Sequence, residues 1–131
     1  MGRFIHLVVS DPPVGTPDDE FNEWYEAHVQ EILAVEGWES ATRYLLDAIV
    51  NSDQTGGFRY LSVYELSLPP AVALANLEAA GMGNADSYVD KKNADVGQLP
   101  MPSWFPEIRF GSWNANQIGD VILPKGARSG A

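Results

Sequence analysis

The sequence predicts an α+β domain with one antiparallel sheet and two helices, and three observations lead to this fold class. The 131-residue chain is long enough for one hydrophobic core and too short for two. Hydrophobic residues make up 45% of it and charged residues 20%, which is a globular composition. Its hydrophobic pattern alternates between strand-like and helix-like periods, in the order strand, helix, strand, strand, helix, strand.

The first two elements have the clearest signals. Residues 4–9 (FIHLVV) form a nearly continuous apolar run, typical of a strand covered on both faces. A helix is expected from Pro17 to Val35, with Thr16 as its N-cap, acidic residues in its first turn and Gly37 beyond its end. On a helical wheel the apolar and aromatic side chains share one broad arc with a single histidine: Phe21, Trp24, Tyr25, His28, Val29, Ile32, Leu33 and Val35. Most acidic side chains fall on the opposite arc, which we expect to face solvent.

The remaining elements follow from changes of period and from turn residues. We expect strands over Trp38–Val50, Phe58–Ser67 and Trp104–Trp113, a turn over 51–57, a helix over Ala71–Ala80 and a short helix over Ser87–Asn93. Pro106 favours an edge position for the last strand. Residues 1–116 should therefore form the domain, and residues 117–131 a C-terminal tail.

This element order is the split βαβ pattern of the ferredoxin-like fold, which places both helices on one face of the sheet. The strands nevertheless carry apolar residues on both parities: Ile5, Leu7 and Val9 alternate with Phe4 and Val8. An apolar sheet face of that size must be covered. The sequence therefore predicts a homodimer in which two sheets face each other, a dimeric α/β barrel.

Composition excludes several classes of function. The formal net charge is −10, from 18 acidic and 8 basic residues, so the surface repels nucleic acid. No apolar run reaches the roughly 20 residues that span a bilayer, and the N-terminus lacks a signal-peptide pattern, which favours a cytoplasmic protein without membrane contacts. With no cysteine and only two histidines, neither a metal site nor a cofactor is expected.

His28 is the most informative candidate for chemistry. It lies within the apolar arc of the first helix, where burial would keep its imidazole neutral and available as a base at neutral pH. The alternative is a core histidine that bonds a backbone carbonyl. A pocket for a flat, apolar substrate would draw on the residues near it and on the strands: His6, Phe21, Trp24, Ile32 and Tyr44.

Residues 21–44 (FNEWYEAHVQEILAVEGWESATRY) resemble the EthD-like branch of the dimeric α/β barrel superfamily, which includes the methylmuconolactone methylisomerases. The shared pattern is an aromatic pair, a histidine, an apolar turn, a glycine, and a strand that ends in a basic residue and tyrosine. The order of elements fits over residues 3–113. The resemblance implies that His28 is the catalytic histidine and that Trp24 and Tyr25 are the aromatic pair. The isomerase's partner cysteine has no counterpart here.

Together these features predict a cofactor-independent isomerase, lyase or cyclase that acts on a small lactone, phenolic or polyketide-like molecule. His28 would transfer the proton as general acid and base, and Tyr25 or Tyr60 would polarise a carbonyl oxygen. Two alternatives stay open. One is a non-catalytic dimer that binds an apolar small molecule or supports a partner enzyme, and the other is a relative of haem-linked monooxygenases.

Overall fold

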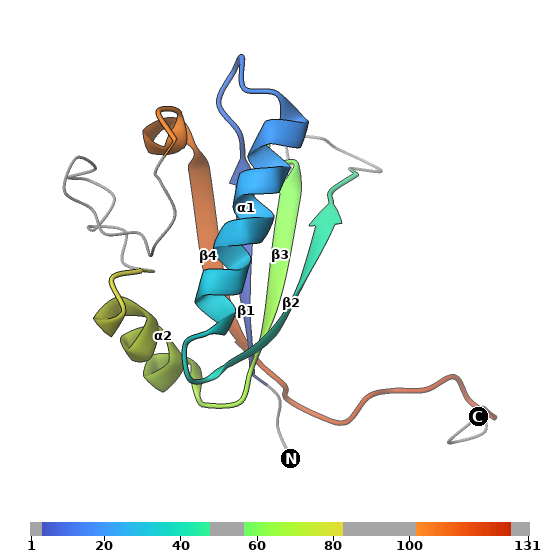
Figure 1. Ribbon diagram of the computed structural model, residues 1–131. Helices are drawn as coiled ribbons and strands as arrows, with labels where there is room; N and C mark the ends of the chain where they lie inside the picture. Colours follow the sequence, from blue (N-terminus) through green and yellow to red (C-terminus); the bar gives the residue numbers. More distant parts are fainter. Residues whose placement is uncertain (1–3, 48–56, 83–101, 127–131) are drawn as a thin grey trace.

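The computed structural model describes residues 4–47, 57–82 and 102–126, which form a four-stranded antiparallel sheet with helices on one face (Figure 1). In chain order the elements are β1 (Phe4–Asp11), α1 (Asp18–Leu33), β2 (Trp38–Leu45), β3 (Tyr60–Leu66), α2 (Pro70–Ala79), the 3₁₀ helix η3 (Phe105–Glu107) and β4 (Arg109–Asn116). The strands lie in the order β2-β3-β1-β4. The α+β class is confirmed, and the topology is compatible with the ferredoxin-like fold.

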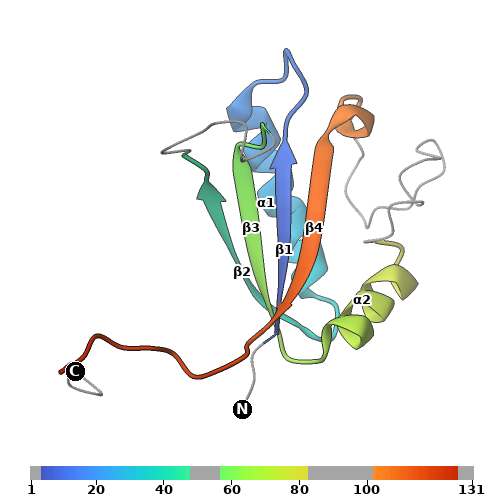
Figure 2. The same ribbon diagram turned by 180° about the vertical axis from the view of Figure 1, so that it is seen from behind.

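The strand register assigns each side chain of β1 to one of two faces. Leu7 pairs with Val63 of β3 on one side and with Trp113 of β4 on the other. These residues and their neighbours of the same parity lie on the sheet face opposite α1. Figure 2 views the sheet from this side, with α1 behind it. His6 and Ser10 have the opposite parity and are buried beneath the helix. The two-sided pattern of the first strand thus reflects one face under α1 and one face that the described helices leave open.

The core lies between α1, α2 and the helical face of the sheet. Its buried apolar residues are Phe21, Tyr25, Val29, Ile32, Trp38, Tyr60, Tyr64, Leu66, Ala73, Leu77, Met82, Phe105 and Ile108. The indole Nε1 of Trp38 donates a hydrogen bond of 2.9 Å to the carbonyl oxygen of Ala73, which ties α2 to β2. Gly37 precedes β2 with a φ of +102°, and a Cβ there would lie 3.1 Å from Leu68 and 3.3 Å from Ala73. Only glycine combines that backbone angle with so close an approach.

Two expected element boundaries prove wrong at the helix start and the last strand. Pro17, not Thr16, takes the N-cap position of α1, with extended backbone and no side-chain hydrogen bond, so the helix begins at Asp18. The chain from Trp104 to Glu107 is a turn and a 3₁₀ helix instead of a strand, because Pro106 has the fixed φ and missing N–H that suit a helical first turn. The strand β4 begins only at Arg109, and it lies at a sheet edge as expected.

The strand β2 ends at Leu45, although the backbone N–H of Leu46 still donates a hydrogen bond of 2.7 Å to the carbonyl oxygen of Arg59. The last part of the expected strand, residues 48–50, lies outside the described residues. The expected short helix over Ser87–Asn93 lies outside the described residues. After β4 the chain runs away from the sheet through residues 117–126 (Figure 1). Among the helices in the described part of the chain, none is long and apolar enough to cross a membrane.

Candidate functional site

A stripe along one side of α1 places the exposed Glu20 in line with two of the predicted site residues, Trp24 and His28. Glu20, Trp24 and His28 are four residues apart, so their side chains lie one above another on the same side of the helix. The imidazole of His28 stacks on the indole of Trp24, with ring centroids 5.0 Å apart and an interplanar angle of 15°. His28 is only 6% exposed. The stack fixes the plane of the imidazole within a largely apolar environment.

The partner of His28 is a carboxylate on the next turn of the helix. The Nδ1 atom of His28 lies 3.4 Å from Oε1 of Glu31, whose side chain is 15% exposed. Burial lowers the pKa of His28 below its ordinary value, and the hydrogen bond and charge of Glu31 oppose that shift in part. The ring is therefore neutral at pH 7. Because an ionised carboxylate only accepts hydrogen bonds, Nδ1 carries the proton and Nε2 holds the basic lone pair.

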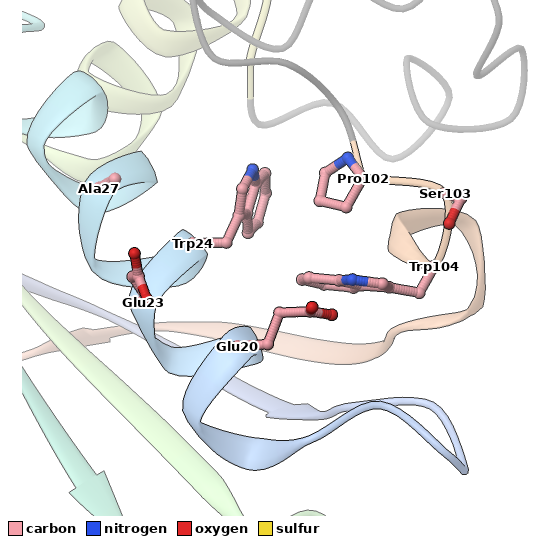
Figure 3. A pocket seen from close by; sticks show the side chains of 7 residues that line it. All are labelled: Glu20, Glu23, Trp24, Ala27, Pro102, Ser103 and Trp104. Atoms are coloured by element: carbon pink, nitrogen blue, oxygen red, sulfur yellow. The ribbon is translucent and has the colours of Figure 1, made fainter.

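A hollow of about 620 Å³ opens on the side of α1 next to Trp24. Its lining comes from Glu20, Glu23, Trp24 and Ala27 of α1 and from residues 102–104 ahead of η3 (Figure 3). His28 is not among these lining residues. Trp24 belongs to both features, because it lines the hollow and stacks on His28. The indole thus stands between the histidine and the hollow.

Tyr25 points from α1 toward a polar cluster on the sheet. Burial raises its pKa above the ordinary value, while Ser62 and Arg43 oppose the shift. The Arg43 guanidinium lies 4.3 Å from the centre of the Tyr25 ring and donates a 2.8 Å hydrogen bond to Asn22. The Nε and Nη2 atoms of Arg43 and the hydroxyl of Ser62 are buried without a well-formed hydrogen bond. Tyr25 is therefore a protonated hydroxyl beside a buried cation, an arrangement that can donate to a carbonyl oxygen.

The structure does not bring Tyr60 to His28. The hydroxyl of Tyr60 donates a 2.7 Å hydrogen bond to Oδ2 of Asp18 and accepts one from Asn22, at the first turn of α1. His28 lies ten residues further along the same helix, which corresponds to about 15 Å at the usual rise per residue. Tyr44 lies on β2 with 51% of its surface exposed, apart from the stripe on α1.

The other expected substrate-binding residues lie in the core. Phe21 is fully buried, and Ile32 is 8% exposed. The Nδ1 atom of His6 lies 2.7 Å from Oδ1 of Asn114 on β4, and its ring packs edge-on against Trp38 at 5.4 Å. Burial lowers the pKa of His6 as it does that of His28. Each histidine is thus bonded to a side-chain oxygen, and neither bonds a backbone carbonyl among the described residues.

Three residues of this region were not predicted as part of a site. Glu31 belongs to the acidic series of α1, yet its spacing of three from His28 places it on the same side of the helix. Arg43 has the same parity on β2 as Ala41, which packs against the core, and this parity is a signal that its side chain faces the helix. Trp104 follows a proline-rich segment, and the sequence contains no sign that it packs against Trp24.

Within residues 4–47, 57–82 and 102–126, no group of three or more His, Asp or Glu side chains is arranged to hold a metal ion. No protein-family model and no curated protein matches the sequence.

Proposed function

We propose that this protein is a cofactor-independent isomerase, lyase or cyclase that acts on a small lactone, phenolic or polyketide-like molecule, with His28 as general acid and base. One observation carries the proposal: a buried histidine, neutral at pH 7, is bonded through Nδ1 to the carboxylate of Glu31. A carboxylate in that position orients the ring and stabilises the imidazolium that forms during proton transfer. The resemblance to the EthD-like branch points to the same residue.

The reaction we infer is a proton transfer at carbon. The Nε2 atom of His28 takes a proton from a carbon next to a carbonyl, and the electrons of the C–H bond move to the carbonyl oxygen as an enolate. The imidazolium then returns the proton to the same or another carbon, or the enolate expels or attacks a neighbouring group. Tyr25 is the candidate donor to the enolate oxygen, because its raised pKa keeps the hydroxyl protonated.

The substrate would be a flat molecule placed by Trp24. This indole stacks on His28 and also lines the hollow beside α1, so a ring held against it in the hollow would be separated from the histidine by the indole. For Nε2 to reach a carbon of that ring, the indole must move aside from its present position between the two.

We also propose that the protein acts as a homodimer joined through the open sheet face. That face carries Leu7, Val63 and the half-exposed Trp113, with further apolar residues of the same parity around them. A second copy would cover this surface, as in the dimeric α/β barrels that the sequence resembles.

A non-catalytic binding protein is the second candidate. The observation that favours it is that His28, the proposed base, is absent from the lining of the hollow. The haem-linked alternative has less support, since an axial histidine must face a pocket and both histidines are 9% exposed or less.

Proton exchange at carbon separates the enzyme from the binding protein without knowledge of the natural substrate. Small unsaturated γ-lactones and phenolic ketones are incubated with the protein in D₂O, and loss of the signal from the acidic C–H is followed by NMR. We expect exchange with at least one probe and a rate roughly 10²–10⁴-fold lower in His28→Gln. The control, Glu39→Gln at an exposed position on β2, should retain the rate. Exchange that is equal in both variants would disprove the role of His28.

A further inference from the structure

The hollow beside Trp24 has a composition that the proposed proton transfer does not explain. Two indoles and two carboxylates lie among its seven lining residues, together with Pro102 and two small residues. A site for a neutral lactone or phenol needs apolar walls and few polar groups. Two carboxylates at the mouth are not required by such a ligand.

The two indoles stand as adjoining walls. The ring centroids of Trp24 and Trp104 are 5.8 Å apart, and their planes meet at 82°. Trp24 is held from behind by the stacked His28 and packs against Phe105 at 5.2 Å. Figure 3 shows both indoles projecting into the hollow, with Pro102 opposite Trp24. Perpendicular aromatic walls of this kind can turn the negative faces of both rings toward one point between them.

The charged side chains of the hollow are also negative, as are the faces of its two indole rings. Glu20 and Glu23 are exposed on α1, and the carboxylate of Glu20 extends toward Trp104 in Figure 3. Among the described residues, neither carboxylate forms an ion pair, whereas Asp18 in the same helical turn is bonded to Arg59 at 2.9 Å. None of the seven described lining residues is basic. A cation that enters the hollow would meet two carboxylates and two ring faces.

We propose that this hollow binds a small organic cation, a quaternary ammonium or an alkylated amine, between Trp24 and Trp104 with Glu20 and Glu23 as counter-charges. Ring faces attract such a cation more than they attract a neutral group of the same shape, and alkylated ammonium is weakly hydrated enough to leave water. The inference does not depend on the role of His28 as a base, because it uses only the walls and the charge of the hollow.

The test compares choline with 3,3-dimethylbutan-1-ol, in which carbon replaces the quaternary nitrogen. Both are titrated into the full-length protein and followed by tryptophan fluorescence and by NMR. We expect saturable binding of choline with a dissociation constant of about 1 mM, and binding of the neutral isostere at least roughly tenfold weaker. Equal affinity for the two molecules, or no saturation by choline at about 50 mM, would overturn the proposal.

Two variants assign the binding to the hollow. Trp104→Leu removes one aromatic wall, and Glu20→Gln combined with Glu23→Gln removes the counter-charges while leaving the walls. We expect each to weaken choline binding roughly five- to tenfold. The matched control is Glu36→Gln with Glu39→Gln, two exposed positions that follow the C-terminal end of α1. This control changes the net charge by the same amount and should leave the affinity for choline unchanged. If circular dichroism shows that Trp104→Leu is unfolded, the double variant Glu20→Gln with Glu23→Gln alone tests the proposal. Unchanged affinity in that variant, or an equal loss in the control, would overturn the proposal.

Discussion

The Nδ1 atom of His28 lies 3.4 Å from Oε1 of Glu31, and both side chains are mostly covered by the fold. This pair fixes the tautomer of the imidazole and leaves Nε2 as the basic atom. Burial lowers the pKa of His28, while Glu31 raises it in part, so the observed environment keeps a neutral base with a nearby counter-charge. The functional proposal depends on this relationship.

Removal of the carboxylate should lower the pKa of His28. In Glu31→Gln the hydrogen bond and the charge that oppose desolvation are lost, so the imidazole should lose its proton at a lower pH. The ring C–H signals of His28, followed by NMR across a pH titration, measure this shift. Glu39→Gln, an exposed position on β2, is the control and should leave the titration unchanged. A pKa that rises in Glu31→Gln would contradict the assigned pairing.

The two buried histidines should make stability depend on pH. Both have a folded-state pKa below the ordinary value of 6.5, so the unfolded chain takes up protons first as the pH falls. The free energy of unfolding should therefore decrease from about pH 7 to about pH 5. The variant with both His6→Gln and His28→Gln should show a smaller decrease, measured by urea denaturation at each pH. An equal pH dependence in wild type and variant would contradict the burial of the histidines in neutral form.

The hydrogen bond between Trp38 and Ala73 should contribute measurably to stability. Trp38→Phe keeps an aromatic ring but removes the indole donor to the Ala73 carbonyl oxygen, which keeps its place in the helical ladder of α2. We expect a loss of about 0.5–1.5 kcal/mol in the free energy of unfolding, the usual net contribution of one hydrogen bond. Trp113→Phe, at a half-exposed position on β4, is the control and should cost less. Urea denaturation measures both variants.

The open sheet face should hold two copies together. Light scattering should give a mass twice the 14.3 kDa of the chain for the wild type. Trp113→Glu places a charge on that face and should shift the mass toward that of the monomer, with the circular dichroism spectrum unchanged. Val72→Glu adds the same charge on an exposed site of α2 and should leave the dimer intact. A wild-type protein that is monomeric at micromolar concentration would contradict the dimer.

The fold was predictable from the sequence where the hydrophobic period is strong. The parity of Tyr60 and Tyr64 against Leu61 and Val63 agrees with the two faces of β3, and the apolar arc of α1 agrees with its buried residues. The prediction failed near Pro17 and Pro106. Proline restricts the local backbone in ways that suit a cap, a first helical turn or an edge strand, and the sequence alone does not choose among these.

The candidate site was only partly predictable for a related reason. The helical period placed His28 and Trp24 together, because contacts one turn apart are encoded in the spacing. The packing of Trp104 against Trp24 joins segments 80 positions apart, which no local period records. Tyr60 has the parity expected for the helical face, but its position along β3 places its hydroxyl at Asp18, away from His28.

Whether His28 is the base can be tested through the pH dependence of proton exchange at carbon. For the lactone or phenolic ketone that exchanges fastest, the rate is measured against pH in wild type and in Glu31→Gln, beside the NMR titration of His28 in each. We expect the exchange rate to rise with pH to a plateau, with a midpoint at the pKa of His28. In Glu31→Gln this midpoint should move to lower pH together with that pKa. A midpoint that stays in place while the His28 titration moves would contradict His28 as the base.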